Sequence, residues 1–331
     1  MKPLLISLLL LLAVSAAHSQ NTETLYAQLP GDPPGGTRWS QFWYDPSQQN
    51  DLDSDMAAYD NFTLTGAAQI TQIEWWGEDP PATPSLPFMG FDIEFYPQDS
   101  HTVAMQPDLT QFYGHSPLAC ERHTDYTQTF VGNGMYHFSV NLAHPLSLNA
   151  NTPANPRYFL AVIARPEMAY YTWGWAQGSG GDGGGTFYFE RAGSPAGSPY
   201  YMLLPDDRAF RLNGISLVPV SLKLAATALH AGQTTKAMVT LNFKVPTGGI
   251  VVGLASSDPQ AVSVPDSLLL AAGATSGQFT VTAKPVRLPT MVTLLATYNG
   301  QSQTATVTVL PNVPHSLRRI GGGLVTPRPH R

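Results

Sequence analysis

Apolar and polar residues alternate with a period of two in much of the chain. Residues 91–96, 136–142 and 209–212 each place an apolar side chain at every second position. Because successive side chains of a β-strand point to opposite faces of a sheet, this period predicts strands with one face on a core. Residues 158–163 are apolar at both parities, which predicts a central strand covered on both faces.

Two such segments lie within residues 59–78, which read YDNFTLTGAAQITQIEWWGE. The alternation assigns Ile73 and Trp75 to the core. It turns Glu74 and Trp76 toward the opposite face of the same strand. Glu74 and Trp76 are therefore candidates for function.

Segments rich in turn residues join the predicted strands, and no segment has a convincing helical period. The 29 Gly, 29 Pro and 12% charged residues favour strands and tight turns over surface helices. The predicted fold class is all-β. We expect an aromatic-rich, jelly-roll-like β-sandwich over residues 20–215 and a smaller, immunoglobulin-like Greek-key β-sandwich over residues 216–311.

The charge of the chain changes sign near residue 216. Residues 20–215 contain 7 Arg, no Lys and 21 Asp or Glu, a net charge of −14, whereas residues 216–331 contain 9 Lys or Arg and 2 Asp, a net charge of +7. So large a shift predicts a domain boundary. We expect salt-sensitive attraction between the two domains. The acidic first half argues against nucleic acid as a partner.

The two ends of the chain have their own signals. Residues 1–19 resemble a secretory signal peptide, with a positive start, an apolar run at residues 4–14 and a small-residue cleavage site. That run is too short to span a bilayer, so we expect no transmembrane anchor in the mature chain and a secreted or cell-surface location. Residues 312–331 carry four Arg without periodicity, which predicts a disordered basic tail.

Several motifs resemble known families. The second half contains SSDPQAVSVPDSLLLAAGATSGQFTVTAKPV and VTLLATYNGQSQTATVTVLP, and through them it resembles the bacterial immunoglobulin-like (Big-type) modules of secreted and surface proteins. This resemblance implies a spacer without catalytic residues. The first half contains YDNFTLT, ITQIEWWGE, WGWAQGSGG and DRAFRLNG, and it is similar to a bacterial secreted, jelly-roll-like accessory domain of unknown function. That resemblance implies export and assigns no functional residue.

Carboxylates and aromatic rings share the outward parity of two strands that we expect to be neighbours. Glu74 and Trp76 lie on one strand, and Asp92, Glu94 and Tyr96 lie on the other. Rings stack on the apolar face of a pyranose, and carboxylates accept hydrogen bonds from its hydroxyl groups, so the set predicts a carbohydrate site. A pair of carboxyl groups could also hydrolyse glycosides. A solvated acidic sheet face is the third interpretation.

An acidic loop at residues 45–60 is a candidate calcium site. Asp51, Asp53 and Asp55 alternate within it, and Ca²⁺ takes several oxygen ligands from one short loop. The loop is not an EF-hand, because Met56 stands where that motif needs glycine. A solvated loop without metal is the alternative.

Two further tryptophans are ambiguous. Trp173 and Trp175 share one face of a predicted strand, just before a glycine-rich loop at residues 178–185. They form either a platform for a ligand or part of the core. The loop lacks the Lys-Ser/Thr pair and the helix of a phosphate-binding loop.

No catalytic residue can be assigned. His115, Cys120 and His123 fall short of a four-ligand zinc set, and serine-hydrolase and zinc-protease motifs are missing. The single cysteine also excludes an intramolecular disulfide. We therefore expect an exported, non-catalytic binding module whose partner is an extracellular glycan or another surface protein. The alternatives are a glycan-active enzyme that uses the outward carboxylates and a purely structural envelope component.

Overall fold

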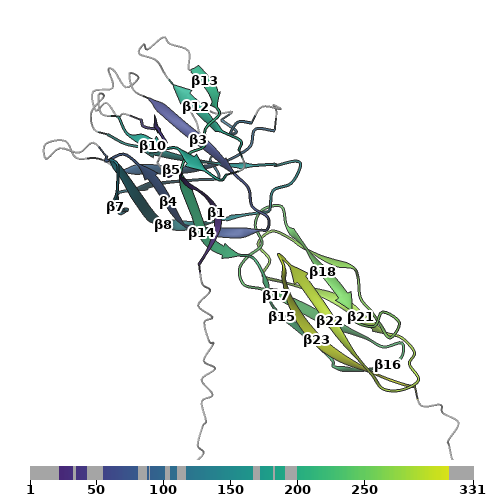
Figure 1. Ribbon diagram of the computed structural model, residues 1–331. Helices are drawn as coiled ribbons and strands as arrows, with labels where there is room; N and C mark the ends of the chain where they lie inside the picture. Colours follow the sequence, from purple (N-terminus) through teal and green to yellow (C-terminus); the bar gives the residue numbers. More distant parts are fainter. Residues whose placement is uncertain are drawn as a thin grey trace, which may run out of the picture.

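The computed structural model describes residues 22–32, 35–42, 55–80, 88, 90–100, 105–109, 117–166, 172–181, 183–190 and 200–312. The predictions for residues 1–19, for Asp51 and Asp53, and for the tail beyond residue 312 lie outside these residues. The described residues form strands joined by turns and loops, which confirms the all-β prediction. Two sandwiches, each built from two sheets, follow one another along the chain (Figure 1).

Two antiparallel sheets form the first sandwich. The path through the first sheet is β11 (Gly178–Ser179), β1 (Glu23–Pro30), β14 (Phe210–Ser216), β4 (Ala68–Gly77), β10 (Gly174–Ala176) and β2 (Thr37–Trp39). Off this path, β8 (Met135–Leu148) pairs with β4, and β7 (Thr127–Gly132) pairs with β8. The second sheet runs in the order β13 (Tyr200–Leu204), β12 (Thr186–Glu190), β3 (Met56–Phe62), β9 (Tyr158–Ala164), β5 (Phe91–Pro97) and β6 (Ala119–His123).

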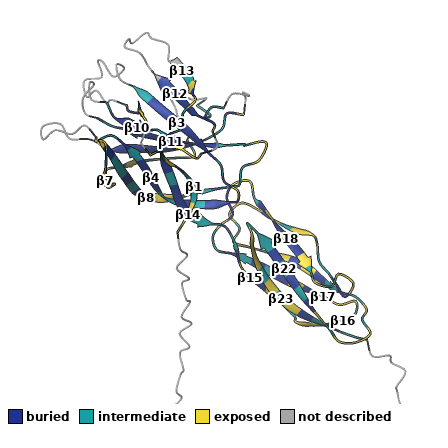
Figure 2. Ribbon diagram, in the orientation of Figure 1, coloured by how far each residue is buried: buried dark blue, intermediate teal, exposed yellow. Residues whose placement is uncertain are grey.

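The second sandwich is smaller. One sheet runs β15 (Pro219–Leu224), β17 (Thr234–Leu241), β21 (Ser276–Ala283) and β19 (Val262–Ser263). The other runs β16 (Ala228–His230), β23 (Gln301–Leu310), β22 (Thr290–Tyr298), β18 (Ile250–Ser256) and β20 (Ser267–Leu270). Figure 2 shows buried residues along the central strands of both sandwiches and exposed residues at many turns.

The core of the first sandwich is aromatic. Trp75 of β4 is fully buried and stacks on Phe138 of β8, with ring centroids 5.4 Å apart and planes 8° apart. Phe91 of β5 comes from the opposite sheet and meets Trp173 edge to face, with centroids 4.9 Å apart. Such pairs contribute about 0.5–1.5 kcal/mol each beyond the area that they bury. The indoles and phenyl rings therefore hold the two sheets together.

Strand β5 corrects the prediction in two ways. It lies in the second sheet whereas β4 lies in the first, so the two strands are not neighbours. Its outward parity, expected to be exposed, is buried as well, and Tyr96 lies in an apolar cluster with Tyr59 and Phe159. Alternation identified the inner face of β5 but could not show that the outer face is covered too. By contrast, β9 is buried at every residue, as predicted.

Neutral contacts join the two sandwiches. Leu217 follows β14 and is fully buried in the aliphatic core of the second sandwich, together with Ala67 of the first. The backbone N–H of Leu217 donates to the carbonyl oxygen of Ala67 at 2.8 Å, and the N–H of Ala67 donates to the hydroxyl of Tyr298 at 3.3 Å. No ion pair connects the described residues of one sandwich with those of the other. Packing and hydrogen bonds therefore form this junction.

Candidate functional site

Glu74 lies on the outer face of the first sheet, as predicted, but its carboxylate is already surrounded by donors. Asn213 Nδ2 donates to Glu74 Oε1 at 2.6 Å. Arg211 Nη1 and His137 Nε2 lie 3.1 Å and 2.8 Å from Glu74 Oε2. Burial alone raises the pKa of Glu74, but the hydrogen bond from Asn213, the charge of Arg211 and the contact with His137 outweigh it and lower that pKa. Few lone pairs remain for a ligand.

Trp76 is enclosed by the same neighbours. Its ring stacks on His137 with centroids 4.7 Å apart, and the guanidinium carbon of Arg211 lies 5.8 Å from the centroid of the Trp76 ring. The indole also packs on a small cluster of Met135, Ala176 and Ala209. A sugar could stack on Trp76 only after displacing one of these side chains.

Asp92 lies on the other outer face of the sandwich and is bound by two guanidinium groups. Arg122 donates through Nε and Nη2, at 2.7 and 3.1 Å, and Arg165 donates through Nε at 2.6 Å. The Asp92 side chain is 5% exposed. A buried carboxylate in this position belongs to a structural ion cluster.

Glu94 and Tyr96 share that face and bond to each other. The Tyr96 hydroxyl donates to Glu94 Oε2 at 2.5 Å, and Cys120 Sγ lies 3.6 Å from Glu94 Oε1. Burial, followed by the nearby charge of Glu94, raises the pKa of the Cys120 thiol to about 12, so the thiol stays protonated. The five residues predicted to form one sugar site are therefore divided between two opposite faces.

Trp173 and Trp175 are core residues. Both are fully buried, and both indole N–H groups are satisfied inside the protein. Trp173 Nε1 donates to the carbonyl oxygen of Glu78 at 3.0 Å, and Trp175 Nε1 donates to that of Ala209 at 2.9 Å. Neither ring is available as a platform.

The calcium prediction stays a prediction. Of its three aspartates, Asp55 alone lies in the described part of the chain. Within that part, no group of three Asp, Glu, His or Cys side chains could hold a metal ion. His123, considered with Cys120 as a candidate ligand, instead lies between two carboxylates, 3.0 Å from Glu121 and 3.0 Å from Asp125.

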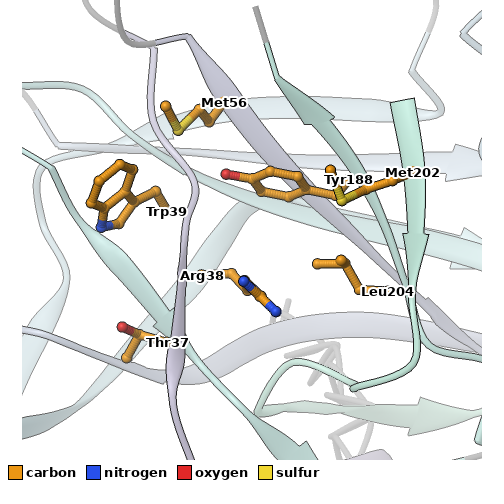
Figure 3. A pocket seen from close by; sticks show the side chains of 7 residues that line it. All are labelled: Thr37, Arg38, Trp39, Met56, Tyr188, Met202 and Leu204. Carbon is orange, nitrogen blue, oxygen red and sulfur yellow. The ribbon is translucent and has the colours of Figure 1, made fainter. Parts of the chain in front are cut away.

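A cleft that the alternation did not predict lies at an edge of the first sandwich. It has a volume of about 410 Å³ and lies between β2, the edge strand of the first sheet, and strands β3, β12 and β13 of the second. The described residues that line it are Thr37, Arg38, Trp39, Met56, Tyr188, Met202 and Leu204 (Figure 3).

Hydrogen bonds of the two residues that follow β2 fix the position of this strand beside the cleft. Directly after β2 it crosses from the first sheet to the second. The Ser40 hydroxyl donates to the carbonyl oxygen of Val162 at 2.6 Å, and the N–H of Gln41 donates to that of Met56 at 2.6 Å. Ser40 and Gln41 are fully buried. These bonds hold β2 against the second sheet, so the cleft is preformed.

The cleft combines an exposed ring, a cation and an apolar floor. Trp39 is 46% exposed, and none of the described aromatic rings stacks on it. Met56 and Met202 pack against the main core, and Tyr188 belongs to it. The Arg38 side chain is about half exposed and lies on the Leu204 side of β2, whereas Trp39 lies on the other side of the strand (Figure 3). Concave apolar walls with a few polar groups are typical of small-ligand sites.

Comparison with known proteins assigns no family. No protein-family model matches the chain, and no curated protein matches it. Among solved structures, the titin domains Z1Z2 in complex with telethonin match at 10% identity, over 84% of this chain and 98% of that chain, with a TM-score of 0.19. So low a score carries no argument about function. The described residues contain no helix with the length and hydrophobicity that a membrane span requires.

Proposed function

We propose that this protein is an exported, non-catalytic binding protein whose first sandwich binds carbohydrate in the cleft between β2 and β13. The observation that carries the proposal is the exposed indole of Trp39 over a preformed space of about 410 Å³. A pyranose can stack its apolar face on that indole. Its hydroxyl groups can donate hydrogen bonds to the hydroxyl of Thr37, which lines the cleft and shares the face of β2 with Trp39.

The place of the cleft supports a spacer role for the second sandwich. Strands β12 and β13 lie at the end of the first sandwich that is remote from the second (Figure 1). The second sandwich has an aliphatic core, and Thr235 is its single buried polar residue among those described. A module of this kind would act as a spacer on the side of the first sandwich away from the cleft.

Binding is favoured over hydrolysis by the position of the carboxylates. A glycosidase places two carboxyl groups roughly 5–10 Å apart beside the scissile bond. Glu74, Asp92 and Glu94 are not among the lining residues of the cleft, and Glu74 lies on the face opposite the other two. The glycan-active enzyme and the structural envelope component remain the alternatives to this proposal.

A glycan array probed with the whole mature protein tests the proposal, with and without Ca²⁺. Hits are then measured by calorimetry for the unmodified protein, Trp39→Ala and Trp39→Phe. We expect Trp39→Ala to weaken binding by about tenfold or more, because a central aromatic anchor commonly contributes at least 1–2 kcal/mol. Trp39→Phe should retain part of the affinity.

The matched control is Trp76→Ala, which removes the other partly exposed tryptophan of the described residues from an outer face. It should bind as the unmodified protein does. Failure to bind any glycan in either condition would overturn the carbohydrate proposal. Loss of binding in Trp76→Ala, with Trp39→Ala unaffected, would refute the cleft as the site.

A further inference from the structure

Strand β7 forms one edge of the first sheet and is exposed on both of its faces. Every residue from Thr127 to Val131 is exposed, and the relative exposures of Phe130 and Val131 are 59% and 53%. Among the described strands, β7 pairs with β8 alone. Figure 1 shows it at the flank of the first sandwich, beyond β8 and away from the second sandwich. Such an edge can pair with a further strand.

The turn that joins β7 to β8 fixes the hydrogen-bond pattern of this hairpin. Asn133 and Gly134 both have a positive φ, 53° and 72°, as a two-residue hairpin turn of this kind requires. Gly132 and Met135 flank the turn and pair with each other, so they form its hydrogen-bonded closing pair. Because hydrogen-bonded and non-hydrogen-bonded pairs alternate along an antiparallel ladder, positions 137 and 139 of β8 also belong to hydrogen-bonded pairs.

This pattern shows which backbone groups of β7 lie at the open edge. Thr129 and Thr127 are the partners of positions 137 and 139, so their N–H and C=O groups point to β8. The N–H and C=O groups of Gln128 and Phe130 therefore point to the other side. No backbone hydrogen bond from another described segment reaches them. The edge thus offers the donors and acceptors that an added strand needs.

The residues of β7 do not protect this edge against pairing. They read TQTFVG, without a charged residue or a proline, which are common means of preventing pairing at an edge. By contrast, β6 at the edge of the second sheet carries Glu121, Arg122 and His123. Threonine, phenylalanine and valine also favour the strand conformation.

A second copy of the chain fits this edge without opposing like charges. If two β7 strands pair antiparallel about a two-fold axis at Thr129, Gln128 of each copy lies opposite Phe130 of the other. Both residues have outward backbone groups, so each of these pairs exchanges its N–H···O bonds, and Thr129 faces its own counterpart. The nearest carboxylates do not meet: Asp125 would face the turn of the other copy, and Asp79, which accepts from Gln128 Nε2 at 2.7 Å, would lie beside Phe130 of the other copy.

We propose that two copies of this protein associate through β7, by antiparallel pairing about Thr129 that joins their first sheets into one. This association does not depend on the proposed binding of carbohydrate. One short strand buries less than the roughly 1,200 Å² at which stable interfaces begin, so the association is weak and depends on concentration. The pair would carry two clefts, and a ligand with repeated units would be held by both.

Sedimentation velocity on the whole mature protein tests the association. The average mass should rise from that of one copy toward that of two between about 10 µM and about 1 mM protein, the range of a weak interface. Thr129→Lys and Thr129→Glu should each lower the association constant by about tenfold or more, because each places two like charges opposite each other. An equimolar mixture of the two variants should recover association, because opposite charges then meet at the axis.

The matched control is Thr306→Lys, which adds the same charge at an exposed threonine of β23 in the second sandwich. It should associate as the unmodified protein does. Hydrogen exchange gives a second readout. The N–H groups of Gln128 and Phe130 should become protected as the protein concentration rises, whereas those of Thr127 and Thr129 should be protected at every concentration.

Three results would overturn the proposal. An unmodified protein that stays monomeric over the whole range would show that β7 does not pair. Association that survives in both Thr129 variants would assign the contact to another surface. Failure of the mixed variants to associate, or unchanged exchange at Gln128 and Phe130 in the associated protein, would exclude pairing about Thr129.

Discussion

The two sandwiches differ in what they bury. Buried polar or charged residues are frequent in the first, including Asp60, Asp92, Glu94 and Arg208, whereas the described part of the second buries only Thr235. Aromatic rings dominate the first core, whereas the second is mainly aliphatic, with Phe279 as the buried ring of its described residues. The carboxylates predicted to form a sugar site, Glu74, Asp92 and Glu94, are therefore buried. A carboxylate beside an aromatic ring in a sequence is weak grounds for a ligand site when the fold can bury both.

The pair Asp60 and Arg208 shows how the first sandwich holds such groups. Both residues are fully buried. Gln28 Nε2 donates to Asp60 Oδ2 at 2.8 Å, and the backbone N–H groups of Arg208 and Asn61 also donate to this carboxyl group. Burial nevertheless raises the pKa of Asp60 well above its ordinary value, because it outweighs these hydrogen bonds. The carboxyl group of Asp60 is therefore enclosed and hydrogen-bonded within the protein, and a ligand cannot reach it.

The largest effect that we expect comes from removing one buried charge of the first sandwich. Asp92→Ala leaves two guanidinium groups without their carboxylate and should lower the free energy of unfolding by about 3–5 kcal/mol. Chemical denaturation measures this change. The control is Asp258→Ala in the second sandwich, where the carboxylate accepts N–H bonds from Gln260 and Ala261 at a turn. It should cost only about 1–2 kcal/mol, and equal losses would remove the contrast between the sandwiches.

A smaller loss in the free energy of unfolding should follow from acidification, because Glu121 of β6 then becomes protonated. Burial alone raises the pKa of Glu121, but hydrogen bonds from the N–H groups of Ala143 and His144 and from the His144 and His123 side chains outweigh it and lower that pKa. A carboxyl group with a lowered folded pKa stabilises the fold above its unfolded pKa, and this contribution is lost as the pH falls through the folded value. After allowance for screening it should amount to about 1 kcal/mol or less.

Denaturation curves between pH 7 and pH 3 can isolate this contribution. Glu121→Gln should be less stable than the unmodified protein at pH 7, and the difference should narrow below pH 4. Asp60 acts in the opposite sense, since its raised pKa favours the folded state at low pH. A difference that stays constant over the whole range would exclude titration of Glu121 as its source.

Much of the fold could be predicted, and the failures have physical causes. Alternation over residues 136–142 and the apolar run at residues 158–163 correctly predicted β8 and β9, because burial on one or both faces dictates those patterns. The alternation of apolar and polar residues does not identify which strand lies next to which. We therefore expected β4 and β5 to be neighbours, although they lie in opposite sheets. Nor does the alternation show whether the outer face of a sheet is covered, and Tyr96 is buried in an apolar cluster on that face.

The cleft could not be predicted for a related reason. Its exposed tryptophan lies on β2, which has three residues, too few to show any period. The other lining residues come from β3, β12 and β13, which are distant in sequence and converge only when the two sheets pack. An Arg-Trp pair in a Gly-rich and Pro-rich segment was the one local signal, and it has no specificity by itself.

The smallest effect, close to zero, is the change that we expect salt to cause at the junction of the two sandwiches. The net charges of residues 20–215 and 216–331, −14 and +7, suggested attraction that salt would weaken. The described contacts are instead neutral: Leu217 and Ala67 share one core, and Tyr298 accepts the N–H of Ala67. Small-angle scattering at 20 mM and 500 mM salt should therefore give nearly the same radius of gyration. Tyr298→Phe, which removes the hydroxyl and keeps the ring, serves as the control for a locally weakened junction, and expansion of the unmodified protein at high salt would show that charge attraction holds the sandwiches after all.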